Sequence, residues 1–161
     1  MLIVNGRLYR DPRQKLGTGV LQDLSTLGDG VFANSGASRA SFGIFLSRVK
    51  ALSLSVDEQV AMIHGLTRST FFRWQKLHAS KKKLRLKFEA FQQIDVVSEL
   101  LGLVMTAQEN QEAASRWLRV KQGAGPLKGR VPIKELIKGD FAIQVSIRDR
   151  LWEEQEGPNL P

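Results

Sequence analysis

Residues 55–77 constrain the fold of this chain more than any other segment, because their spacing is that of two short helices joined by a turn. Ser55 followed by Glu58 is a capping-box pattern, in which each residue satisfies an amide that would otherwise be unpaired at a helix start. Apolar residues then recur at helical spacing as far as Ile63, and Ala61 is small where a second helix has to cross closely. A helix is therefore predicted to begin at residue 55.

A second helix is predicted over residues 68–77. Gly65 precedes it, at a position where a left-handed backbone conformation favours glycine, and Thr67 is a suitable N-cap. Phe71 and Trp74 share one side of this helix and are expected to face inward. The opposite side is short, polar and basic, and consists of Arg68, Ser69, Phe72, Arg73 and Lys76. This arrangement predicts a helix-turn-helix whose second helix enters the major groove of DNA with its N-terminus first.

The charge distribution supports this interpretation. The chain carries a net charge of +8, but residues 1–87 hold 15 Lys or Arg against 5 Asp or Glu, whereas residues 88–161 hold 9 against 11. A basic run that directly follows the second helix continues the positive charge. We therefore predict that the protein binds double-stranded operator DNA, with one set of residues contacting base edges and another contacting phosphates. The base-edge residues are Arg68, Ser69, Thr70 and Arg73, and the phosphate-contacting residues are Lys76, Lys81, Lys82 and Lys83.

Several other classes of protein are disfavoured by the composition. The chain has no cysteine and two histidines without a metal-like partner at helical spacing, so neither a metal site nor a cofactor is expected. An enzyme acting on nucleic acid would need clustered carboxylates or a nucleophile beside a base, and Asp57 and Glu58 are better explained by helix initiation. No apolar stretch approaches the roughly 18 to 20 residues that span a bilayer, and the first residues do not resemble a secretory signal. A cytoplasmic protein without enzymatic activity is expected.

The remaining patterns predict an all-α fold in three parts. Residues 1–38, which are rich in glycine and show weak strand-like alternation over residues 1–9, form a partly irregular arm. Residues 39–87 form a small helical bundle that contains the helix-turn-helix and begins with an amphipathic helix from Arg39. Residues 88–161 form a helical domain that ends in a short acidic tail. A long apolar stripe over residues 88–104 predicts one helix, or two with a break near Gly102. Its width also favours self-association as a homodimer.

Further helix boundaries follow from local signals beyond this stripe. Thr106 with Glu109 repeats the capping-box pattern and predicts a helix start. Pro132 is suited to the first position of another helix, and Gly139 to its end. Asp140 is expected to cap the final helix, on which one side is shared by Phe141, Val145, Arg148 and Trp152.

Three segments of the C-terminal half, read in order, resemble the toxin-binding domain of Xre/MbcA/ParS-type antitoxins. They are Arg116-Trp117-Leu118-Arg119, the stretch from Gly125-Pro126 through Val131-Pro132-Ile133 to Gly139, and Arg148-Asp149-Arg150-Leu151. The resemblance covers about residues 88–152, with a helix-turn-helix upstream where the family has one.

This resemblance implies an all-helical, dimeric type II antitoxin that neutralises a toxin and represses its own operon. The toxin of such a pair is often a RES-domain enzyme that acts on NAD, and it holds the catalysis. The matched positions, chiefly scaffold, are Trp117, Leu118, Pro132, Leu136 and Gly139. The candidates for occluding the toxin are expected to be exposed residues of the last helix and tail, and they include Arg148, Arg150 and Glu153. The long arm and the tail Glu153–Glu156 depart from the family pattern. The alternative is a stand-alone transcription regulator whose C-terminal domain serves only for dimerisation.

Overall fold

A computed structural model describes residues 2–4, 7–9 and 32–157 of the 161-residue chain. Two compact units are present, Met1–Phe32 and Ala33–Pro161. In the first unit, β1 (Leu2–Val4) pairs antiparallel with β2 (Arg7–Tyr9), and Leu2 lies opposite Tyr9. The strand signal over residues 1–9 therefore corresponds to a hairpin rather than to one strand. The remainder of the predicted arm, as far as residue 31, lies outside the described residues.

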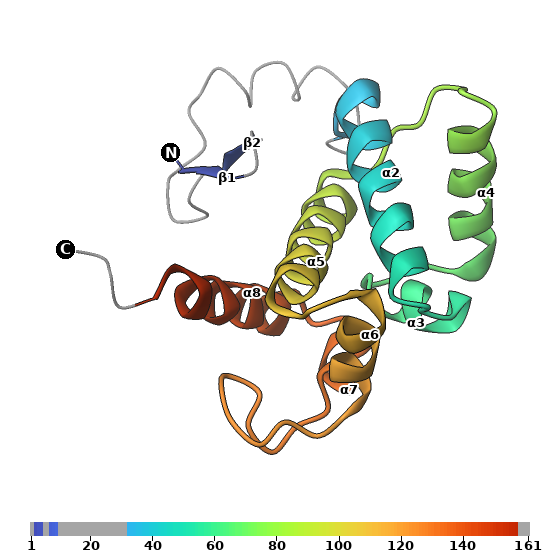
Figure 1. Ribbon diagram of the computed structural model, residues 1–161. Coiled ribbons are helices and arrows are strands. Elements are labelled where there is room, and N and C mark those ends of the chain that lie inside the picture. Colours follow the sequence, from blue (N-terminus) through green and yellow to red (C-terminus); the bar gives the residue numbers. More distant parts are fainter. Residues whose placement is uncertain (1, 5–6, 10–31, 158–161) are drawn as a thin grey trace. The chain divides into compact units, whose positions relative to one another are not determined.

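The second unit is helical throughout its regular structure, which confirms the all-α prediction. Within residues 32–157 the helices are α2 (Ser35–Ala51), α3 (Val56–Ala61), α4 (Arg68–Ala79), α5 (Phe88–Ala107), α6 (Gln111–Arg119), α7 (Pro132–Leu136) and α8 (Phe141–Glu156). Figure 1 shows α2, α4 and α5 side by side, with α3 near the lower ends of α2 and α4 in this view, and with α6, α7 and α8 near the lower end of α5.

Helix α5 is the centre of this unit, because it packs against α2 on one side and against α8 on another. Its buried residues include Ile94, Val97, Leu101 and Val104. These contacts account for the width of the apolar stripe, so the stripe gives no support for the predicted self-association. Helix α5 also runs unbroken through Gly102. A Cβ at that position would lie 2.7 Å from the Arg48 guanidinium carbon, so glycine there allows a side chain of α2 to cross α5.

Two predicted helix starts were wrong by several residues. Helix α2 begins at Ser35 instead of Arg39, because the Asn34 side chain accepts hydrogen bonds from the amides of the first turn. The first residues of this helix were assigned to the arm. Helix α6 is capped by Asn110, not by Thr106. Thr106 is still within α5, where its hydroxyl donates to the Gly102 carbonyl at 2.9 Å.

A buried pair of glutamines joins the two halves of the helical unit. The Gln93 amide group on α5 donates to the Gln144 side-chain oxygen on α8 at 2.8 Å and to the Gly139 carbonyl at 3.0 Å. Gln144 in turn donates to the carbonyl of Met62, just after α3, at 2.8 Å, and the Gln93 oxygen accepts from the His64 amide at 2.8 Å. Residues 33–157 thus share one core, and a boundary at residue 87 would separate functions, not packing units.

Candidate nucleic-acid interface

The start of α3 is fixed by the predicted capping box. The Ser55 amide donates to a Glu58 carboxylate oxygen at 2.8 Å, and the Glu58 amide donates to the Ser55 hydroxyl at 3.2 Å. Both groups would otherwise lack a partner within the helix. This prediction is confirmed, and it sets the direction in which α3 approaches the turn.

The connection to α4 is longer than the sequence suggested, because α3 ends at Ala61. The buried residues Met62 and Ile63 follow the end of this helix and lead into the turn. Gly65 then adopts a φ of 71°, as expected for the turn. The side chain of Ala61 is exposed, so it is not the predicted site of close helix crossing. The close approach is made instead by Gly139, where a Cβ would lie 2.9 Å from the Ala61 carbonyl oxygen.

Helix α4 rests on an aromatic platform formed with α2. Its N-terminus is capped by Thr67, whose hydroxyl accepts from the Thr70 amide at 3.3 Å. Phe71 and Trp74 are buried, as predicted, and their rings lie 6.0 Å and 5.8 Å from that of Phe42 in edge-to-face geometry. Edge-to-face rings at this distance attract each other beyond the area they bury. The buried side of α4 is thereby held, and its opposite side faces outward.

The outward side of α4 carries the residues predicted to meet DNA. Arg68, Ser69, Phe72, Arg73 and Lys76 are exposed and follow one another at helical spacing, whereas Thr70 is half-buried beside its cap. Arg68 Nη1 lies 2.7 Å from Asp57 Oδ1 on α3, and both side chains are largely exposed. An exposed ion pair of this kind contributes only about 0 to 1 kcal/mol, so a phosphate or a base edge competes with it at little cost.

The C-terminal end of α4 is closed by a Schellman-type turn and by an arginine from α2. Lys81 adopts a φ of 56°, and the amide of Lys82 donates to the Leu77 carbonyl at 3.0 Å. Arg39 Nη1 donates to the Lys82 carbonyl at 2.8 Å, and its Nη2 donates to the His78 carbonyl at 3.2 Å. A cation at a helix C-terminus also complements the helix dipole. Sequence analysis identified Arg39 only as the start of a helix. In the structure its side chain positions the turn at Lys81 and Lys82, called the lysine turn below.

The basic segment of residues 81–87 continues from this turn, and from residue 84 on its buried and exposed residues alternate. Leu84 and Leu86 are buried, and the cations around them, Lys81, Lys82, Lys83, Arg85 and Lys87, are exposed. No Asp or Glu occurs between Glu58 and Glu89, a stretch that contains eight Lys or Arg. Apart from Arg68, none of those eight forms an ion pair within the described residues. Every charged side chain of α4 and the following turn is thus cationic, which is the electrostatic character of a phosphate-binding surface.

Helix α3 is also joined to the C-terminal half by an ion pair that sequence analysis did not predict. Arg119 at the end of α6 contacts Glu58 through two hydrogen bonds, Nη1 to Oε1 at 2.7 Å and Nη2 to Oε2 at 3.0 Å. This guanidinium lowers the pKa of Glu58 despite the opposing effect of partial burial, and the carboxylate in turn raises the pKa of Arg119. The Glu58 carboxylate of this capping box therefore stays ionised to a lower pH than an unpaired glutamate does.

Five of the eight residues assigned to toxin binding are buried in this fold. They are Leu118, Pro132, Leu136, Gly139 and Arg148. The expectation that Arg148 lies on an exposed face of the last helix was wrong. Its guanidinium contacts Asp149 at 2.8 Å and Glu99 of α5 at 3.4 Å, which compensates the charge. The buried side of α8 comprises Gln144, Ile147, Arg148 and Leu151, whereas Phe141, predicted on that side, is exposed.

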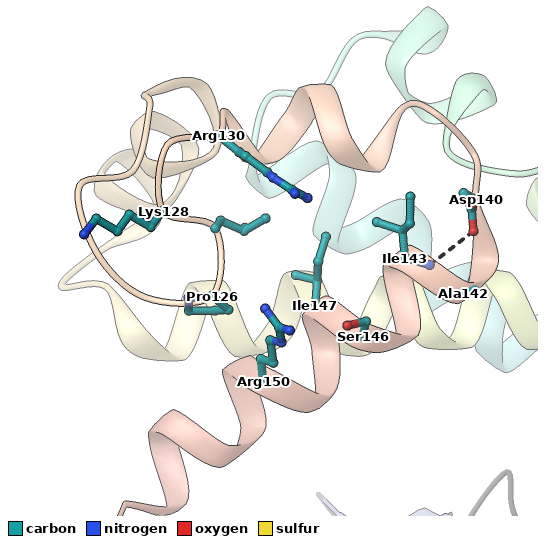
Figure 2. Close-up of a pocket in the computed structure, with 10 residues that line it drawn as sticks. Pro126, Lys128, Arg130, Asp140, Ala142, Ile143, Ser146, Ile147 and Arg150 are labelled. Atoms are coloured by element: carbon teal, nitrogen blue, oxygen red, sulfur yellow. Dashed lines mark hydrogen bonds between the residues drawn. The ribbon is translucent and has the colours of Figure 1, made fainter.

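The other assigned residues lie at the surface of the C-terminal half. Trp117 is partly buried against the core, and Arg150 and Glu153 are exposed on α8. Arg150 lines an open groove of about 430 Å³ between residues 126–130 and α8, with Ile143 and Ile147 along its apolar side. Figure 2 shows the Arg130 and Arg150 side chains extending toward this groove, while that of Lys128 points away. Pro132 at the first position of α7 and the Asp140 cap of α8 agree with prediction.

Comparison with protein-family models, with curated proteins and with solved structures gave no match. The described residues contain no group of three or more His, Asp or Glu side chains that are placed to hold a metal ion. Among the helices of residues 32–157, none has both the length and the apolar character needed to cross a membrane.

Proposed function

We propose that the protein is a DNA-binding antitoxin that represses its own operon and neutralises a cognate toxin. The DNA-binding part of this proposal rests on one observation. Helix α4 presents an exposed cationic side while its other side is held on the aromatic platform of α2. The major groove is about 12 Å wide, which accommodates the diameter of about 10–12 Å of an α-helix with its side chains, and the 12 residues of α4 extend about 18 Å at 1.5 Å per residue.

Within this proposal the exposed residues have different tasks. Arg73 forms no ion pair within the described residues, and a guanidinium binds the O6 and N7 edge of guanine bidentately. Arg68 and Ser69, near the N-terminus of α4, also face base edges, whereas Lys76 and the lysine turn contact phosphates. A homodimer on two half-sites about one helical turn apart would pair two copies of α4. A cytoplasmic location follows from operator binding.

DNA binding is tested by enriching duplexes from a random library and then titrating the best duplex. Arg73→Ala is expected to weaken binding by about 1–3 kcal/mol and to relax the base preference at one position. Arg116→Ala, which removes an exposed arginine from α6, is the matched control and should bind like the unmodified protein. Equal affinities of the Arg73→Ala variant and the unmodified protein would remove Arg73 from the interface, and failure to enrich any duplex would refute DNA binding.

The antitoxin part of the proposal is supported by the family resemblance and by the exposed end of α8, which leaves Arg150 and Glu153 accessible. The test is co-expression with the product of the adjacent gene, a small RES-type enzyme in this proposal. Growth is expected to be restored, and the two proteins are expected to copurify. Continued growth arrest in the presence of soluble protein would refute neutralisation.

A stand-alone transcription regulator is the second candidate, because burial within the fold already accounts for five of the residues matched to the toxin-binding motif. This candidate predicts operator binding without any toxic neighbour. It also predicts that sedimentation with and without operator shows a dimer, and that no product of an adjacent gene copurifies with the protein.

A further inference from the structure

Phe72 is exposed on the cationic side of α4, where folding does not require an aromatic residue. Three large apolar side chains are exposed within residues 32–157, namely Val120, Phe141 and Phe72, the last at 46%. Of these, Phe72 is the one on α4, within the side that also carries Arg68, Arg73 and Lys76. Burial in the core therefore does not account for the exposed part of this ring.

The surroundings of Phe72 hold the ring at the surface. Its centroid lies 6.1 Å from that of the buried Phe71, with the ring planes tilted by 53°. The Arg68 guanidinium carbon, one turn earlier on the helix, lies 5.9 Å from the ring centroid, within the range of a cation–π contact. Arg68 is itself tethered to Asp57 on α3. The ring is thus flanked by two neighbours and presents its remaining surface outward.

An apolar surface surrounded by cations fits a partner that is anionic and carries apolar groups at fixed positions. The major groove of DNA has this character, because phosphates line it and the C5-methyl group of thymine projects into it. Single-stranded nucleic acid binds by stacking bases on open aromatic faces. The Arg68 guanidinium lies over the Phe72 ring, which makes an apolar contact to a methyl group the better fit.

We propose that Phe72 is a specificity-determining residue that contacts the C5-methyl group of a thymine in the bound duplex. This inference rests on the proposed DNA binding. It adds a preference for thymine over uracil, which presents the same hydrogen-bonding edge but lacks the C5-methyl group. The Phe72 contact to a thymine methyl group and the proposed Arg73 contact to a guanine edge would together determine the base preference.

The test uses the best duplex enriched from the random library, with each thymine replaced in turn by deoxyuridine. Loss of one buried methyl contact is expected to weaken binding of the unmodified protein about fourfold at one thymine of each half-site. Phe72→Ala should bind the thymine and uracil duplexes equally, and Phe72→Leu should retain part of the preference. Phe141→Ala removes an exposed phenylalanine from α8 and should keep the full preference. Circular dichroism of each variant verifies that the helices are intact.

The outcomes separate this inference from the function on which it rests. If no duplex is enriched, DNA binding fails and the role of Phe72 fails with it. If a duplex is enriched and Arg73→Ala weakens its binding, but uracil has no effect at any thymine, the contact of Phe72 alone is overturned. A uracil effect that persists in Phe72→Ala, or tighter binding to the single strands than to the duplex, would overturn it as well.

Discussion

Replacement of Gly139 by alanine tests whether the turn between α7 and α8 is held against the end of α3. Gly139 has a φ of 67°, and an added Cβ would lie 2.9 Å from the Ala61 carbonyl oxygen. The left-handed conformation costs an alanine about 1–2 kcal/mol, of which about 0.4–1 kcal/mol is offset by the smaller entropy of the unfolded chain. Crowding against a backbone atom adds about 1–3 kcal/mol. We therefore expect a total destabilisation of about 1–5 kcal/mol, with a central value of about 3 kcal/mol.

Gly129→Ala is the matched control for this substitution. Gly129 has a φ of 79°, and no atom lies within 4 Å of its added Cβ, so it shares the conformational cost without the crowding. Its destabilisation should remain near about 1 kcal/mol or below. Urea unfolding followed by circular dichroism measures both values, and a loss of about 3 kcal/mol lowers the midpoint by about 1.5 M if the slope is about 2 kcal/mol per M. Equal free energies of unfolding for the two variants would refute the close contact between Gly139 and Ala61.

Two further predictions concern charge. Replacing Lys81–Lys83 by glutamine should weaken binding to all duplexes and reduce the slope of log affinity against log salt by about 0.9 for each phosphate contact removed; an unchanged slope would exclude these lysines from the interface. Glu58→Gln keeps a capping-box side chain but loses the ion pair with Arg119. Because Arg119 lowers the pKa of Glu58, this pair contributes its full stability above the ordinary value of 4.5 and loses it as the pH falls through the lower, folded value. Urea unfolding between pH 7 and pH 3 should therefore show a smaller acid loss for Glu58→Gln, and identical acid losses would contradict the assignment.

The features that sequence analysis predicted correctly depend on short-range chemistry. The caps at Ser55, Thr67 and Asp140 and the left-handed turns at Gly65 and Gly139 each involve groups no more than a few residues apart. Such interactions are nearly the same wherever the segment lies in the fold. The orientation of α4 was predicted for a similar reason, since a helix with one apolar side has little choice of which side to bury.

The features that it missed depend on partners far along the chain. The pattern at Thr106 resembled a cap as closely as that at Ser55, but α5 continues to Ala107, and Asn110 caps the next helix. Arg148 was expected at the surface because an arginine rarely lies inside without a partner, and the partner that admits it, Glu99, is 49 residues away. Arg39 likewise reaches carbonyl groups of α4 about 40 residues further on. Short-range patterns contain no information about these pairings.

The glutamine pair between α5 and α8 limits how this chain can be divided or recombined. A fragment that begins at residue 88 would retain Gln93 and Gln144 but lose the Met62 carbonyl and the His64 amide that complete their hydrogen bonds. Each polar group left unpaired in the interior costs about 1–3 kcal/mol, which is a large share of the stability of a small protein. A chimera that joins residues 33–87 to a foreign C-terminal half would meet the same mismatch unless both glutamines and the Gly139 turn were transplanted with it. The proposed DNA specificity is therefore easier to change by substitutions on the surface of α4 than by exchange of whole halves.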